Sequence, residues 1–133
     1  MLIGVAAPDF RPLARAFSTG DSSATAPAQI QGRSGVRHEF AFALLSEPGK
    51  AKVVLDAELS TNDVDEIKVL KFYVKVFDVG PEKAVLCVCP RLDKRAAALA
   101  REYGVVVLED ESPLNLASAA EKFVEQNFRV SSK

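Results

Sequence analysis

Two acidic side chains lie two residues apart near the middle of the chain. Asp56 and Glu58 belong to an apolar run over residues 52–59, and alternate residues of a strand point to the same face. Adjacent carboxylates repel each other unless a cation lies between them or one of them takes up a proton. Oxygen ligands of this kind suit Mg²⁺ or Mn²⁺. The pattern predicts either a divalent-cation site at Asp56 and Glu58 or a hairpin edge with both acids in water.

Basic side chains form a stripe in the segment that follows this strand. Lys68, Lys71 and Lys75 are spaced by three and then four residues, which places them on one side of a helix. Such a stripe can neutralise backbone phosphates, or it can be the solvated side of an amphipathic helix. Three more candidates for a nucleic-acid-binding surface precede the strands, namely Arg33, Arg37 and His38.

Other kinds of chemistry find little support in the residues. The chain has no glycine-rich phosphate loop, and its single histidine, His38, has no nucleophile motif near it. Cys87 and Cys89 fall on one side of a predicted strand, where neighbouring same-side cysteines are badly placed for a mutual disulfide. They are expected to be buried free thiols, with a redox or metal-binding role as the alternative.

Length, net charge and the lengths of the apolar runs limit the classes of protein to which this chain can belong. The 133 residues include 17 Lys and Arg against 18 Asp and Glu, a net charge of −1, which suits one globular domain and excludes a strongly basic nucleic-acid binder. No apolar run approaches the ~20 residues that a membrane span needs. Residues 1–7 lack a positively charged leader. We therefore expect a cytoplasmic protein without membrane contact.

Hydrophobic periodicity predicts eight elements in the order α, β, β, α, β, α, β, α. Residues 1–19 form a short amphipathic segment with helical spacing of its apolar residues from Phe10 to Phe17. Residues 18–35 form a loop or mobile linker, 36–45 a strand, 47–50 a turn and 52–59 the paired strand. A helix capped at 61–63 carries an apolar stripe of Ile67, Leu70, Val74 and Phe77, a pattern typical of a face that packs on the core. A strand over 83–89, a helix over 92–103, a strand over 105–108 and a helix from 113 to about 127 complete the chain.

These elements predict an α/β fold with a mixed sheet. The connection between the first two strands is too short for anything but an antiparallel hairpin. The later strands are joined through helices and should be parallel and covered on both faces. We expect two parts: residues 1–32 as an amino-terminal helix with a mobile loop, and residues 33–130 as the folded domain.

The residues resemble a known family over roughly positions 33–109. Gly35 is followed at the spacing Gly-x-x-His-Glu-Phe by the first strand, an acidic hairpin strand comes next, and an alanine-rich helix leads through Tyr103 and Gly104 into a last short strand. This arrangement resembles the PD-(D/E)XK nuclease superfamily, most closely prokaryotic and often archaeal proteins of the Mrr and Holliday-junction-resolvase type. The resemblance implies a restriction-endonuclease-like three-layer sandwich.

The resemblance also implies a Mg²⁺-dependent site, which this chain carries in altered form. Glu39 corresponds to the family's assisting acid and Asp56 to the acid of its [D/E]-x-K motif. Ala41 occupies the position of the family's aspartate, and Glu58 that of its lysine. Metal-assisted cleavage of a phosphodiester needs two or three oxygen ligands on one cation. The altered motif therefore predicts a degenerate active site.

Three functions follow as hypotheses. The first is a catalytically impaired nuclease-fold domain that binds nucleic acid or serves in assembly. The second is an active Mg²⁺-dependent DNA endonuclease that uses Glu39, Asp56 and Glu58 as its catalytic residues. The third is a pure assembly module, a homo-oligomer that pairs through a sheet edge or its last helix. DNA and a second copy of the chain are accordingly the expected partners.

Overall fold

A mixed five-stranded sheet forms the centre of the molecule. The structure, a computed structural model, describes residues 8–18, 23–47 and 50–128. The strands of the main sheet lie in the order β1-β4-β5-β6-β7, and a second sheet pairs β2 with β3. Their bounds are β1 Ser23–Thr25, β2 Ala28–Gln31, β3 Arg37–Phe40, β4 Phe42–Glu47, β5 Lys50–Leu59, β6 Lys83–Cys89 and β7 Val106–Glu109.

Strand direction follows the length of each connection. β4 and β5 are antiparallel neighbours joined by a tight turn, whereas β5, β6 and β7 run parallel because a helix separates each from the next. The predicted α/β class, with an antiparallel hairpin followed by parallel strands, is therefore confirmed. The predicted strands over 52–59 and 83–89 are found with the same carboxyl ends.

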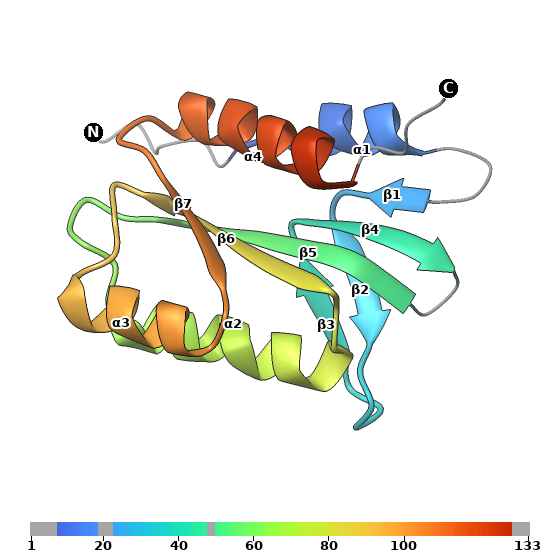
Figure 1. Cartoon of the computed structure of the whole chain (residues 1–133), viewed down its shortest axis with the longest axis horizontal. Coiled ribbons are helices and arrows are strands. Elements are labelled where there is room, and N and C mark those ends of the chain that lie inside the picture. The colour runs from blue at the N-terminus through green and yellow to red at the C-terminus, as the bar shows by residue number, and fades with distance from the viewer. Residues whose placement is uncertain (1–7, 19–22, 48–49, 129–133) are drawn as a thin grey trace, which may run out of the picture.

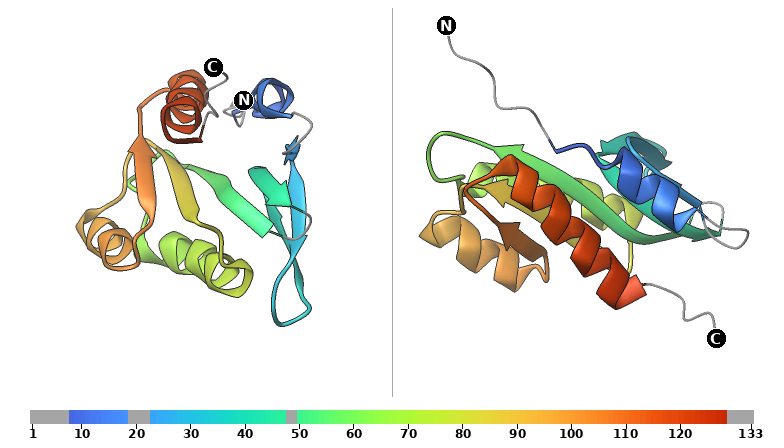
Figure 2. Two further views of the ribbon diagram at one scale, coloured as in Figure 1. Left: turned by 45° about the vertical axis from the view of Figure 1, so that its right-hand side comes forward. Right: turned by 90° about the horizontal axis from the view of Figure 1, so that it is seen from above.

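Helices cover both faces of this sheet (Figure 1). α1 Arg11–Phe17 and α4 Pro113–Phe128 lie on one face, and α2 Glu66–Val79 and α3 Lys94–Glu102 lie on the other. Two views from other directions show the same arrangement (Figure 2). The central strands alternate between the two cores, so that Leu55 packs toward α1 and α4 and Val54 packs toward α2 and α3.

Local signals set the helix ends. Asp65 caps α2, in place of the predicted cap at 61–63, and Asp93 caps α3. Each accepts a hydrogen bond from a backbone N–H group of the first turn. Gly80 ends α2 in the left-handed conformation, at φ 72°, where a glycine has no steric penalty. α4 begins at Pro113, directly after Ser112, as the sequence predicts. Within the described residues, no helix is long and apolar enough to cross a membrane.

The expected linker over 18–35 is wrong where the structure describes it. β1 pairs with β4, and β2 pairs with β3, so residues 23–31 belong to the fold and the proposed boundary at residue 32 has no structural basis. The strands escaped prediction because few of their residues are strongly apolar, although Ala24, Ala28 and Ile30 are buried. Residues 19–22 of the expected linker, and residues 1–7, lie outside the described residues.

The expected strand over 36–45 is also incorrect, because the chain bends at Ala41. β3 ends at Phe40 in the two-stranded sheet and β4 begins at Phe42 in the main sheet. Strand alternation therefore does not carry across the bend, and Glu39 does not share a face with Ala41 as one continuous strand would require.

The apolar stripe of α2 was expected to pack on the core, but it faces solvent. Val69 and Phe72 are the buried residues of this helix. Ile67, Leu70, Val74 and Phe77 are all exposed. α2 is apolar on two opposite sides, and periodicity alone does not say which side meets the core.

Candidate functional site

Asp56 lies in the second half of β5 on the face covered by α2, and each of its carboxylate oxygens has a protein partner. Oδ1 accepts a hydrogen bond from the Ala41 backbone N–H at 2.8 Å, and Oδ2 lies 2.5 Å from Nζ of Lys75. The side chain is only 20% exposed. Both oxygens thus have protein partners, one at the bend between the two sheets and one on the helix.

The charge of Asp56 depends on Lys75. Burial raises the pKa of the Asp56 carboxyl above its ordinary value, and the nearby Glu39 carboxylate adds to the rise. The Lys75 ammonium and the Ala41 N–H act in the opposite direction. A carboxylate in this position needs a neutralising partner, and the structure supplies one from α2.

Lys75 connects three elements through one ammonium group. Besides the Asp56 contact, its Nζ donates to the Glu39 carbonyl oxygen at 2.6 Å and lies 4.6 Å from the centroid of the Phe40 ring. The ammonium therefore joins α2 to the end of β3 and to the middle of β5, with an aromatic face as a third contact.

The other two acids of the predicted site do not complete it. Glu58 shares the face of Asp56, as predicted, but lies 3.7 Å from Lys68 of α2. Glu39 is exposed on β3, paired in register with Gln29. Ala41, at the position of the family's aspartate, packs with the core on the α1 side of the sheet.

A magnesium ion does not fit this arrangement. Among the described residues, no three His, Cys, Asp or Glu side chains are grouped so that they could hold a metal ion. Oδ1 of Asp56 already accepts the Ala41 N–H, and Oδ2 lies beside the Lys75 ammonium, whose positive charge would repel a cation at this position. The predicted metal ligands Asp56 and Glu58 instead each form an ion pair with a lysine of α2.

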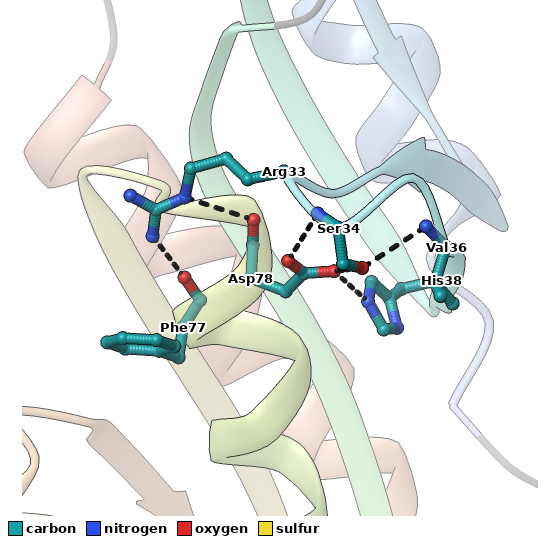
Figure 3. A network of polar contacts seen from close by, with 6 residues as sticks. All are labelled: Arg33, Ser34, Val36, His38, Phe77 and Asp78. Atoms are coloured by element: carbon teal, nitrogen blue, oxygen red, sulfur yellow. Dashed lines mark hydrogen bonds and ion pairs between the residues drawn. The ribbon is translucent and has the colours of Figure 1, made fainter.

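Two of the predicted nucleic-acid-binding residues hold the β2–β3 loop against the end of α2 (Figure 3). Arg33 donates from its guanidinium to the carbonyl oxygens of Phe77 and Asp78. His38 Nε2 lies 2.8 Å from Asp78 Oδ2. Arg33 caps the carboxyl end of the helix, where cationic groups are stabilising, and His38 is paired in a partly buried site.

Asp78 is the centre of this network, and sequence analysis missed it. Its carboxylate accepts hydrogen bonds from the backbone N–H and the hydroxyl of Ser34, at 2.9 and 2.7 Å, in addition to the His38 contact. Together these bonds lower the pKa of Asp78 to about 2, Ser34 having the larger effect. The partners are 40 and 44 positions away from Asp78 in sequence, so no local pattern indicates these contacts.

Few of the predicted phosphate contacts remain free. Lys68 and Lys75 are paired with the acids of β5, and Arg33 and His38 with the end of α2. Within residues 8–18, 23–47 and 50–128, Arg37 and Lys71 are the members of the set without an ion pair or a side-chain hydrogen bond. The basic stripe therefore functions largely as the counter-charge of β5.

The cysteines are free and buried, as predicted. Cys87 and Cys89 lie in the same core, toward α1 and α4. Burial raises the pKa of the Cys87 thiol to about 12, so it is protonated near neutral pH and a poor nucleophile or metal ligand.

A polar depression lies where β5 and β6 end, another feature that the motif analysis did not find. It has a volume of about 600 Å³ and is lined by Ser60, Asn62, Cys89 and Arg91 among others. Arg91 lies 3.1 Å from Asp63 and 2.5 Å from Glu111, which also line the depression. The carboxyl edge of parallel strands is a common ligand position, but here two acids already satisfy the single arginine.

Comparison with known proteins supports the fold alone. No family model and no curated protein matches this chain. Among solved structures it is similar to the crystal structure of a protein of unknown function designated AF1548, with a TM-score of 0.59 and 11% sequence identity over 92% of this chain and 70% of that one. The architecture defines an α/β protein with a mixed sheet.

Proposed function

We propose that this chain is a catalytically silent domain on the restriction-endonuclease-like fold and that it serves assembly. Support for the fold comes from the order of elements: an antiparallel hairpin with an acid on its inner strand, followed by helix, strand, helix and strand. Helices on both faces of the sheet agree with a three-layer sandwich. The similarity to AF1548 adds a second fold-level argument without adding a function.

The state of Asp56 carries the proposal of catalytic silence. In a metal-dependent nuclease this carboxylate would present an oxygen to the cation. Here Oδ1 receives the Ala41 N–H and Oδ2 the Lys75 ammonium, and Glu58 pairs with Lys68. The acidic motif stabilises the fold through these contacts, and its ion pairs oppose the hypothesis of an active Mg²⁺-dependent endonuclease.

An assembly role is favoured over nucleic-acid binding by what the surface of α2 exposes. Most of its predicted phosphate-binding lysines are paired with acids, whereas four of its large apolar side chains are open to solvent. Clustered exposed apolar groups mark interaction surfaces more often than scattered ones do. Arg37 and Lys71 would be the remaining contacts for a nucleic acid.

Cleavage and metal binding test the proposal directly. The full chain, incubated with duplex and branched DNA in Mg²⁺ or Mn²⁺, should leave both substrates intact, and calorimetric titration with either cation should give no saturable heat. DNA retardation should be absent at moderate salt. Cleavage that disappears in Asp56→Ala but persists in the matched variant Asp63→Ala would overturn the proposal, provided that circular dichroism shows both variants folded.

A further inference from the structure

The outward side of α2 is an apolar stripe. Ile67, Leu70, Val74 and Phe77 are 51%, 37%, 63% and 65% exposed, respectively. They lie opposite Val69 and Phe72, which are buried against the sheet. α2 occupies the outer layer of the fold beside α3 (Figure 1). A helix that is apolar on two opposite sides is typically covered on both, so the stripe needs a partner.

Two stacked tyrosines flank the stripe, and an arginine lies at its carboxyl end. Tyr73 stacks on Tyr103 of α3 with ring centroids 4.0 Å apart, and Phe77 lies 6.1 Å from Tyr73. The Arg33 guanidinium lies over the Phe77 ring at 5.6 Å. Tyrosine, phenylalanine and arginine are enriched at the centres of protein interfaces. The surface therefore has the composition of a protein contact.

The intervals between the stripe residues are the same whether α2 is followed from its amino end or from its carboxyl end. Its members are separated by three, four and three residues, so the pattern is symmetric about the level of Phe72. A twofold axis at that level places Ile67 of one copy opposite Phe77 of the second, and Leu70 opposite Val74. Every member then meets another member, which is what a twofold-symmetric interface requires.

Charge at the two ends of α2 favours the same antiparallel pairing. The amino-terminal end carries Asp65 and Glu66, the latter 3.7 Å from Arg95 of α3, and the carboxyl-terminal end carries Arg33. Asp78 at that end is engaged by Ser34 and His38. Antiparallel helices bring the acidic end of one copy to the Arg33 end of the other and also oppose their dipoles. A net charge of −1 gives little repulsion between copies.

We infer that two copies of this chain pair through α2, antiparallel and about the level of Phe72. This inference rests on the proposed assembly function and names its partner. The four stripe residues form the interface along the helix, the stacked Tyr73 and Tyr103 lie beside its middle, and Arg33 lies at each end.

Sedimentation equilibrium of the full chain tests the pairing. The native protein should be a dimer, and Val74→Asp should be a folded monomer because it would place a carboxylate at the centre of the contact. Ile67→Asp provides a second variant. Leu114→Asp on α4 is the matched control, since Leu114 is 83% exposed on the opposite layer; it should remain dimeric.

Cysteine cross-linking tests the direction. Mixing Ile67→Cys protein with Phe77→Cys protein under mild oxidation should give a disulfide-linked dimer. Ile67→Cys alone should not, because antiparallel pairing separates the two copies of position 67 by about 15 Å along the helix, beyond the reach of a disulfide. The buried native cysteines provide the background in both samples.

Each other outcome overturns a defined statement. A native monomer at all concentrations, or a dimer that survives both stripe variants, overturns pairing through α2 and leaves catalytic silence standing. Efficient cross-linking of Ile67→Cys alone overturns the antiparallel direction. Metal-dependent cleavage by an intact dimer would overturn the proposed function while the pairing itself held.

Discussion

Lys75 and Asp56 form an ion pair of 2.5 Å between α2 and the middle of β5. The two side chains are 25% and 20% exposed, so water screens the pair less than it screens a surface contact. The pair turns the acid of a predicted metal site into a connection between helix and sheet. Loss of this ion pair should therefore have a measurable effect on stability.

Lys75→Met should lower the free energy of unfolding by about 2 kcal/mol, because Asp56 would keep its position without a neutralising ammonium. Lys68→Met is the matched control on the same helix. Lys68 lies 3.7 Å from Glu58, with side chains 48% and 32% exposed, and its loss should cost less than about 0.5 kcal/mol. Urea unfolding near neutral pH measures both. Equal costs for the two variants would contradict this account of Lys75.

Asp56→Asn and Asp56→Ala should differ in whether the Ala41 N–H at the bend keeps a hydrogen-bond acceptor. Asparagine keeps an oxygen that can accept the Ala41 N–H, whereas alanine leaves that group without its acceptor. We expect Asp56→Ala to be the less stable by about 1 kcal/mol. Hydrogen exchange at the Ala41 amide provides a local check: protection should persist in Asp56→Asn and be lost in Asp56→Ala. Similar exchange in both would rule out the proposed bond.

Acid should weaken the contact between the β2–β3 loop and α2. The pKa of Asp78 lies at about 2 in the fold, against an ordinary value of 3.8. Because folding depresses this pKa, the contribution of Asp78 is present above the ordinary value and is lost as pH falls from about 4 to about 2. Unfolding curves across this range should show a steeper loss of stability for the native chain than for Asp78→Asn. Parallel pH profiles would contradict the assignment.

Gly32→Ala should destabilise the protein by about 1 to 3 kcal/mol through a steric conflict. A Cβ at position 32 would lie 2.0 Å from Asp78 Oδ2 and 2.4 Å from its Cγ. The carboxylate would have to leave Ser34 and His38 to make room. In an Asp78→Ala background the same substitution should cost much less, and thermal unfolding of the four proteins measures the difference. If Gly32→Ala lowered stability equally in both backgrounds, a conflict with the Asp78 side chain would not be the cause.

Cys87 should resist alkylation in the folded protein. Burial raises the pKa of its thiol to about 12, and thiolate is the reactive form. Iodoacetamide should modify it only under unfolding conditions, as mass spectrometry of the peptide would show. Rapid modification of the native chain would contradict this description of the core.

Much of the fold was predictable because its signals are local. Gly80 and Gly104 end their helices, Ser112 and Pro113 begin α4, and the run over 83–89 is apolar enough to be recognised as a strand with two covered faces. β1 and β2 were missed because tertiary contact, and not their own composition, makes them strands. The direction of the α2 stripe was missed because both sides of that helix are apolar.

The site was predictable only in part. The shared face of Asp56 and Glu58 follows from strand alternation, and Lys68 and Lys75 fall on one side of α2 by helical spacing. That these lysines meet those acids depends on how α2 lies across β5, which no single-element pattern contains. The bend at Ala41 and the role of Asp78 likewise depend on residues distant in sequence.

The bend at Ala41 also has a consequence for how the chain is made. Asp56 holds it from β5 and Lys75 holds the preceding Glu39 carbonyl from α2, while Asp78 secures the loop before β3. All three residues are synthesised after the segment that they contact. As the nascent chain leaves the ribosome, the segment from Ser34 to Ala41 cannot complete these contacts until residue 78 has been synthesised.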